Sequence, residues 1–105
     1  MKFEEYEKAS ALTDLGNQPW YYTLGISGEC GEVSEKIKKL YRDNKGKYDQ
    51  NWVIELEKEI GDVLWYLSRL AAKFDTTLEN CAKSNIKKLK SRKKRNKLSG
   101  SGDNR

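Results

Sequence analysis

The sequence predicts an all-α protein, a bundle of about four helices in which two long central helices pair antiparallel across a short loop. Three observations support this fold class. Apolar residues recur at helical spacing over most of the chain, no stretch shows the alternation of a β-strand, and a single proline leaves room for long helices. A chain of 105 residues, 36% hydrophobic and 35% charged, has a modest core, so we expect a homodimer or homotetramer to complete the bundle.

The first three helices are predicted from their apolar repeats. Residues 3–15 carry a short repeat that ends at the break GNQP. A second helix begins near Trp20, directly after the proline, and runs to about residue 43. A polar loop, NKGKYDQ, leads to a third helix over about residues 51–74, which has the strongest repeat in the chain. The second and third helices are the two expected to form the central hairpin.

The fourth helix is predicted to follow a short turn at residues 75–76. Thr76 and Glu79 have the spacing of a capping box, and the helix is expected to end around Arg95. We therefore predict one domain over residues 1–97 and a Gly/Ser-rich tail over residues 98–105.

The composition excludes several kinds of catalytic site. Histidine is absent, which removes Ser-His-Asp and Cys-His catalysis and histidine zinc sites, and no P-loop motif occurs. Cys30 and Cys81 show no metal-binding or disulfide spacing. A metal ion would need oxygen ligands, which favours magnesium, manganese or calcium. No signal peptide or membrane span is apparent, so we expect a cytoplasmic protein without a membrane partner.

Charge is distributed unevenly along the chain. Residues 86–105 hold nine of the 21 basic residues and one of the 16 acidic residues, a net charge of +8. The remaining twelve basic and fifteen acidic residues give the body −3. A mildly acidic body thus precedes a strongly basic C-terminal segment.

Carboxylates line both central helices beside the apolar stripes. On a helical wheel the second helix aligns Glu29 and Glu32 with Lys36, and the third helix aligns Glu59 with Asp62. In an antiparallel pair the four carboxylates would face one another and repel unless a cation joined them, which predicts a magnesium site. Glycines recur in the same segments and are expected to allow close approach of a backbone or ligand; they are Gly25, Gly28, Gly31 and Gly61.

The segments GISGECGEVSEKIKKL and ELEKEIGDVLWYLSRLA resemble the MazG-like nucleotide pyrophosphohydrolases. A downstream segment, NIKKLKSR, matches a further family motif, and the resemblance covers about residues 20–95. It implies an all-α, oligomeric, Mg²⁺-dependent enzyme, with Mn²⁺ as a possible substitute, that hydrolyses a nucleoside triphosphate to the monophosphate and pyrophosphate. The residues it assigns to catalysis and metal binding are Glu29, Glu32, Glu59 and Asp62.

Further residues are candidates for substrate binding. The expected phosphate ligands are Lys36, Lys88, Arg92, Arg95 and Arg105, the last two with Lys97 in a tail that closes as a lid over the triphosphate. The favoured base-binding residues are Trp20, Gln18 and Asn85. Other aromatic residues available for stacking are Tyr21, Tyr22, Trp52, Trp65 and Tyr66, of which Trp65 is better explained by core packing. Glu35 is a candidate general base; the alternative is a surface role or indirect support of the metal site.

Two other functions compete with the enzyme. The basic segment predicts a nucleic-acid-binding module, although four placed carboxylates would repel a phosphate backbone without a metal. A non-catalytic helical interaction protein would bind metal without turnover. We therefore favour the pyrophosphohydrolase, with a nucleoside triphosphate as substrate and nucleic acid as the less favoured partner.

Overall fold

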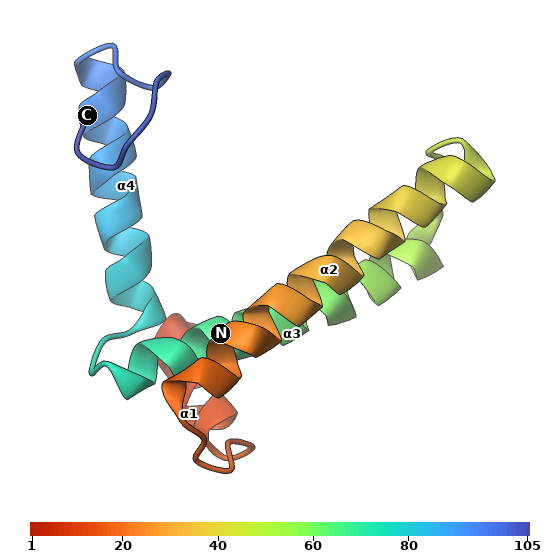
Figure 1. The fold of residues 1–105 in the computed structure, drawn as a ribbon, viewed down its shortest axis with the longest axis horizontal. Helices are drawn as coiled ribbons and strands as arrows, with labels where there is room; N and C mark the ends of the chain where they lie inside the picture. Colours follow the sequence, from red (N-terminus) through yellow and green to blue (C-terminus); the bar gives the residue numbers. More distant parts are fainter.

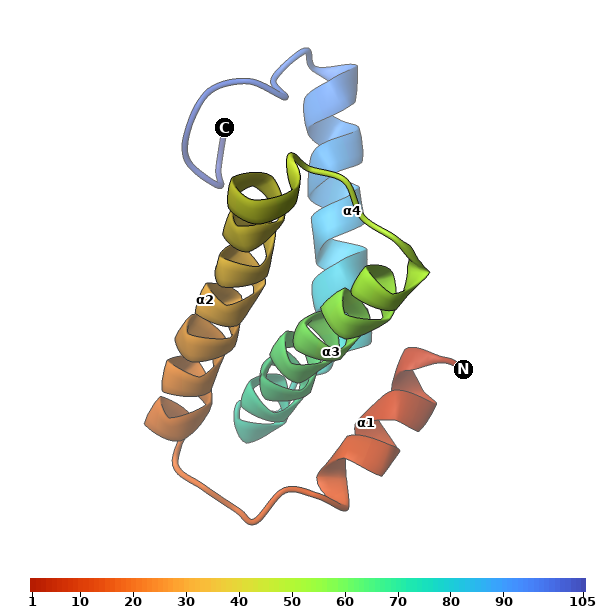
Figure 2. The same ribbon diagram turned by 90° about the vertical axis from the view of Figure 1, so that its right-hand side faces the viewer.

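The computed structural model describes residues 1–105 and contains helices as its regular elements. They are α1 (Phe3–Ala11), α2 (Pro19–Asn44), α3 (Gln50–Lys73) and α4 (Leu78–Lys94). The predicted all-α class is confirmed, and α2 and α3 form the expected antiparallel hairpin (Figure 1). The short α1 lies beside α3 near the open end of the hairpin (Figure 2), whereas α4 projects away from it.

The turn that joins α2 to α3 is defined by local backbone chemistry. The helix α2 ends where Lys45 adopts a left-handed conformation with φ of 56°, and Gly46 follows with φ of 78°. A Cβ atom at Gly46 would lie 2.7 Å from the ring of Tyr41. Both the positive φ and this close ring therefore favour glycine. The helix α3 then begins at an N-cap, because the Asp49 carboxylate accepts a hydrogen bond of 2.9 Å from the backbone N–H of Trp52.

Two predicted helix ends are corrected by the structure. The first helix stops at Ala11 instead of residue 15, and residues 12–18 form a loop. The predicted capping box at Thr76 is wrong, because the N–H of Thr76 still donates to the carbonyl of Ala71 at the end of α3. Thr77 caps α4 instead, its side chain accepting a hydrogen bond of 3.0 Å from the N–H of Asn80.

A buried polar network holds the α1–α2 loop against α3. The Asp14 carboxylate accepts hydrogen bonds from the hydroxyl of Tyr22 at 2.5 Å, from Nε of Arg69 at 2.9 Å and from the N–H of Gly16 at 3.0 Å. Tyr22 is fully buried. Trp65, on α3, donates from its indole nitrogen to the side chain of Thr13 at 2.8 Å, which supports the predicted packing role of Trp65.

One chain buries few of its residues. Seven of 105 are buried, and the Cα radius of gyration is 16.7 Å, whereas a globular chain of this length has about 13 Å. Several residues of the predicted apolar stripes are therefore exposed in the single chain: Cys30, Ile37, Tyr41, Ile60, Leu67, Phe74, Cys81, Ile86 and Leu89. Completion of the bundle by a second copy stays a prediction, which this exposed apolar surface supports. None of the four helices has a stretch both long and apolar enough to span a membrane.

Candidate active site

Three carboxylates from the two central helices converge. Glu29 comes from α2, and Glu59 and Asp62 lie one turn apart on the facing side of α3. One oxygen from each lies within 4.8 Å of the other two. Glu29 and Glu59 are half-buried and Asp62 is exposed. Helical spacing on both helices and their antiparallel pairing produce this cluster, as the stripes predicted.

Glu32 lies beside the cluster without joining it. It follows Glu29 by about one turn on α2, and its negative charge raises the pKa of Glu29. It also lines a groove together with Glu59. The four predicted carboxylates are thus gathered in one region, and oxygens of three of them lie within 4.8 Å of one another.

The electrostatics of the cluster favour a cation. Burial raises the pKa of Glu29, and the neighbouring charges of Asp62, Glu59 and Glu32 raise that pKa further. No lysine or arginine forms an ion pair with any of these four carboxylates. An oxygen-only donor set with uncompensated repulsion fits a hard divalent cation.

The glycines of this region differ in their surroundings. A Cβ atom at Gly25 would overlap the ring of Tyr66, which lies across this position from α3. Close approach therefore occurs at Gly25, but by a side chain of α3 and not by the predicted backbone or ligand. No atom of this chain comes as close at Gly28, Gly31 or Gly61, where an added Cβ would have open space.

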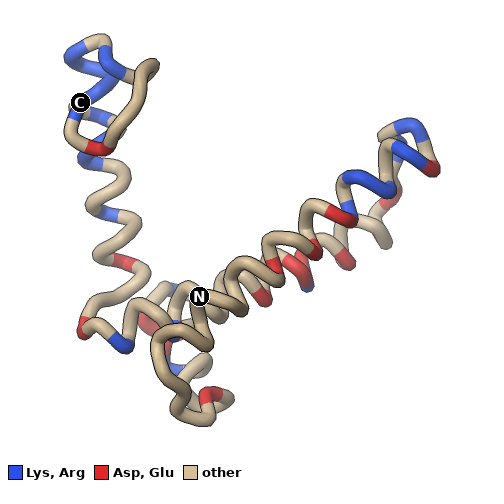
Figure 3. The backbone as a smooth tube through the Cα atoms, in the orientation of Figure 1, with Lys and Arg blue, Asp and Glu red and all other residues tan.

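A groove of about 630 Å³ extends from the carboxylates toward the α2–α3 turn. It contains Lys36, a predicted phosphate ligand, close to Glu32 and Glu59. Figure 3 shows the acidic residues over the middle of the hairpin and the basic residues toward its turn. The residues that line the groove are Glu32, Glu35, Lys36, Lys39, Leu40, Asn44, Lys47, Tyr48, Asp49, Trp52 and Glu59.

Glu35, the candidate general base, is held by lysines. Its carboxylate accepts a hydrogen bond of 2.7 Å from Nζ of Lys38 and lies 3.9 Å from Nζ of Lys39. The hydrogen bond and charge of Lys38 lower the pKa of Glu35. A surface role, the alternative weighed from the sequence, agrees with this pairing.

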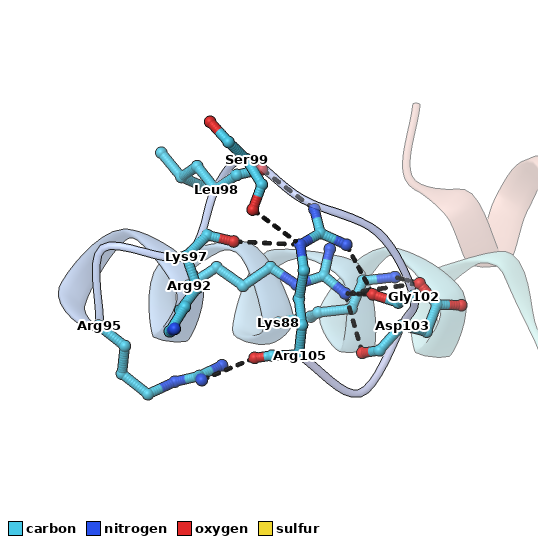
Figure 4. A network of polar contacts seen from close by, with 9 residues as sticks. All are labelled: Lys88, Arg92, Arg95, Lys97, Leu98, Ser99, Gly102, Asp103 and Arg105. Carbon is cyan, nitrogen blue, oxygen red and sulfur yellow. Dashed lines mark hydrogen bonds and ion pairs between the residues drawn. The ribbon is translucent and has the colours of Figure 1, made fainter.

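The remaining predicted phosphate ligands lie at the C-terminal end of α4 and bind the tail (Figure 4). Nζ of Lys88 lies 2.9 Å from the Asp103 carboxylate, and the buried Arg92 donates to the carbonyls of Gly102 and Asp103 at 3.2 and 2.8 Å. Arg95 donates to the terminal oxygen of Arg105 at 2.7 Å. The tail therefore folds back on α4, apart from the carboxylates of its own chain (Figure 1).

The Arg105 side chain closes this C-terminal loop. Its guanidinium donates to four backbone carbonyls at 2.6 to 3.2 Å, those of Lys97, Leu98, Ser99 and Gly102. The predicted phosphate ligands Arg95 and Arg105 thus have partners within the tail itself.

The three predicted base-binding residues are dispersed. Trp20, 63% exposed, lies at the start of α2 with its edge toward Tyr21, and Gln18 is the N-cap of that helix. Asn85 lies on α4 in a shallow hollow with Lys88. None of the three lines the groove.

At the far end of the groove the structure goes beyond the prediction, which named Trp52 among the residues available for stacking but did not include Tyr48. Tyr48 and Trp52 form an aromatic pair there, with Lys39 and Lys47 nearby. The available signal was two aromatic residues four positions apart, one inside the lysine-containing loop NKGKYDQ and one just after it.

The segment that carries the carboxylates is also the part of the chain that is similar to known proteins. A family model described as the MazG nucleotide pyrophosphohydrolase domain matches residues 18–96, a range that contains all four carboxylates. The Gene 37 protein of Mycobacterium phage L5 is 45% identical over 85 residues, which cover 81% of this chain and 75% of that protein. No solved structure matches this chain. The chain belongs to the MazG nucleotide pyrophosphohydrolase family.

Proposed function

We propose that this protein is a Mg²⁺-dependent nucleoside triphosphate pyrophosphohydrolase, which converts an NTP or dNTP to the nucleoside monophosphate and pyrophosphate. The observation that carries the proposal is the convergence of Glu29, Glu59 and Asp62, without a cationic partner, beside a groove of nucleotide size. Membership of the family supplies the general activity.

The metal would be held by Glu29, Glu59 and Asp62, with Glu32 next to them as the fourth ligand predicted from the sequence. Magnesium suits carboxylate oxygens and a phosphate-bearing substrate, and manganese could replace it. A bound ion would neutralise phosphate charge and lower the pKa of a water molecule.

The chain's own residues orient the substrate. Lys36, which lines the groove with Glu32 and Glu59, would contact a phosphate oxygen. Because Glu35 is tied to Lys38, a carboxylate of the cluster is the better acceptor for a proton of the attacking water. Attack at the α-phosphorus would release pyrophosphate.

The cations of α4 would act in a homo-oligomer. Within one chain, α4 and the tail diverge from the α2–α3 hairpin that carries the carboxylates (Figure 1). Lys88 and Arg92 would reach a triphosphate if α4 of one copy lay against the α2–α3 hairpin of another, and exposed Ile86 and Leu89 on α4 support such packing. The tail would then serve as the predicted lid after its contacts with Lys88 and Arg92 are released.

The test is an assay of the purified protein with Mg²⁺ against the eight common NTPs and dNTPs, in which pyrophosphate and orthophosphate are measured separately. We expect pyrophosphate with monophosphate, and loss of turnover in Glu59→Gln. The matched control is Glu57→Gln, an exposed glutamate of the same helix outside the cluster and groove. Turnover that persists in Glu59→Gln would contradict the assigned metal site.

A nucleic-acid-binding module is the second candidate, favoured by the +8 charge of residues 86–105. No turnover with Mg²⁺ or Mn²⁺, together with salt-dependent binding of a duplex or single strand, would replace the enzyme with this reading. The carboxylate cluster counts against it, because without a metal these negative charges would repel a phosphate backbone.

A further inference from the structure

The turn end of the groove carries an aromatic pair, exposed Tyr48 and half-buried Trp52, to which the carboxylate chemistry assigns no role. The ring centroids of Tyr48 and Trp52 lie 5.5 Å apart, with 38° between the ring planes. Tyr48 is 65% exposed, so the pair is not part of the core. We propose that Tyr48 and Trp52 form the platform on which the nucleotide base stacks, an inference that rests on the proposed function.

The position of Trp52 is fixed by the start of α3. The Asp49 carboxylate accepts a hydrogen bond from the N–H of Trp52, which anchors the first turn of the helix. Tyr48 lies just after the turn at Lys45 and Gly46 and also lines the groove. A binding surface on a helix start is better ordered than one on a free loop, as a stacking site requires.

The chemistry along the groove follows the order of a nucleotide. Glu59 and Trp52 are seven residues apart on α3, or about 10 Å at 1.5 Å per residue. Lys36 and Lys39 line the groove from α2, one turn apart. Carboxylates at one end, lysines along one wall and aromatic rings at the other end correspond to the metal, phosphates and base of one bound substrate.

Stacking predicts weak discrimination among bases. An aromatic platform contacts the face that every base presents, whereas hydrogen bonds to base edges distinguish one base from another. The pair therefore identifies the substrate class as nucleoside triphosphates broadly, with contributions to KM that are similar for purines and pyrimidines.

The test compares binding of two probes by titration calorimetry with Mg²⁺. One is the α,β-methylene analogue of the nucleotide that the wild-type protein hydrolyses best; the other is inorganic tripolyphosphate, which has no base. We expect Trp52→Ala to weaken analogue binding roughly 5- to 150-fold, as for stacked bases elsewhere, and to leave tripolyphosphate binding unchanged. Trp52→Phe should recover most of the analogue affinity.

Matched tyrosine variants control for folding. Tyr48→Ala should weaken analogue binding, whereas Tyr41→Ala, 67% exposed on the same hairpin end but outside the groove lining, should not. Trp20→Ala tests the base site predicted from the sequence. If only Trp20→Ala weakens analogue binding, or if Trp52→Ala weakens both probes equally, the aromatic platform is refuted.

The outcomes separate the two proposals. If the wild-type protein neither hydrolyses nor binds any nucleotide, the pyrophosphohydrolase assignment fails and the platform fails with it. If the wild-type protein hydrolyses nucleotides and Trp52→Ala binds the analogue with wild-type affinity, the platform alone is overturned.

Discussion

Asp14→Asn is expected to destabilise the protein strongly. The Asp14 side chain is 7% exposed and pairs with Arg69, whose side chain is 15% exposed, while it also accepts hydrogen bonds from Tyr22 and Gly16. Removing one partner of a buried ion pair costs about 3–5 kcal/mol. Because the pair is not completely buried, we expect a loss near the low end, about 3 kcal/mol in the free energy of unfolding.

The loss should depend on pH in a defined direction. Burial alone would raise the pKa of Asp14, but hydrogen bonds from Tyr22, Arg69 and Gly16 outweigh burial and lower the pKa from 3.8 to about 2. A lowered folded-state pKa stabilises the fold above pH 3.8, and this stabilisation disappears as the pH falls toward 2. At 1.36 kcal/mol per pKa unit, the stabilisation is about 2 kcal/mol.

The assay is urea unfolding of the wild type and Asp14→Asn at pH 7 and pH 2.5, at one protein concentration because association would shift the transition. The difference between the two proteins should shrink by most of the titratable 2 kcal/mol at the lower pH. Asp43→Asn is the control, since Asp43 pairs with Arg42 at 58% exposure of both side chains, where a pair contributes about 0–1 kcal/mol. A loss below about 1 kcal/mol at pH 7, or an equal loss at both pH values, would refute the account.

Three further predictions concern the candidate site and the tail. Gly25→Ala should displace the ring of Tyr66 and lower the unfolding free energy by about 1–3 kcal/mol, whereas Gly28→Ala should not; urea unfolding distinguishes them. Glu29→Gln should raise the melting temperature of the metal-free protein, because carboxylate repulsion falls, and should weaken Mg²⁺ binding in calorimetry; a lower melting temperature would contradict the repulsion. Arg105→Ala should accelerate amide hydrogen exchange across residues 98–105, and unchanged exchange would show that the guanidinium does not order the tail.

The features predicted well from the sequence are those that depend on local helical geometry. Glu59 and Asp62 share a face because they are three residues apart, and antiparallel pairing of two apolar stripes brings Glu29 to that face. No information beyond periodicity is needed for this step. Helix ends were less predictable, since the N–H of Thr76 is bonded to the previous helix and this depends on the left-handed conformation of Asp75.

The features that the sequence did not predict, including the pairing of Trp52 with Tyr48 in the groove, depend on long-range contacts or on turn geometry. Asp14 meets Arg69 across 55 positions of sequence, and no spacing rule connects them. Tyr48 and Trp52 become a surface of the groove only because the turn at Lys45 and Gly46 returns the chain beside α2. The folded tail likewise depends on Arg105, whose guanidinium donates to several backbone carbonyls. Composition alone does not predict these hydrogen bonds.

The apolar pattern predicts that a residue is buried, but it does not predict whether its own chain or a second copy buries it. On α4, Leu78 is buried at the joint with the rest of the fold, whereas Ile86 and Leu89 are 51% and 40% exposed although they continue the same stripe. An added Cβ is blocked at Gly25 by Tyr66 of the same chain and meets nothing at Gly28. Apolar residues that are buried within the chain define its fold. Those left open by the fold define the surface where we expect a second copy or the nucleotide, and we expect a second hairpin at the exposed stripe of α4.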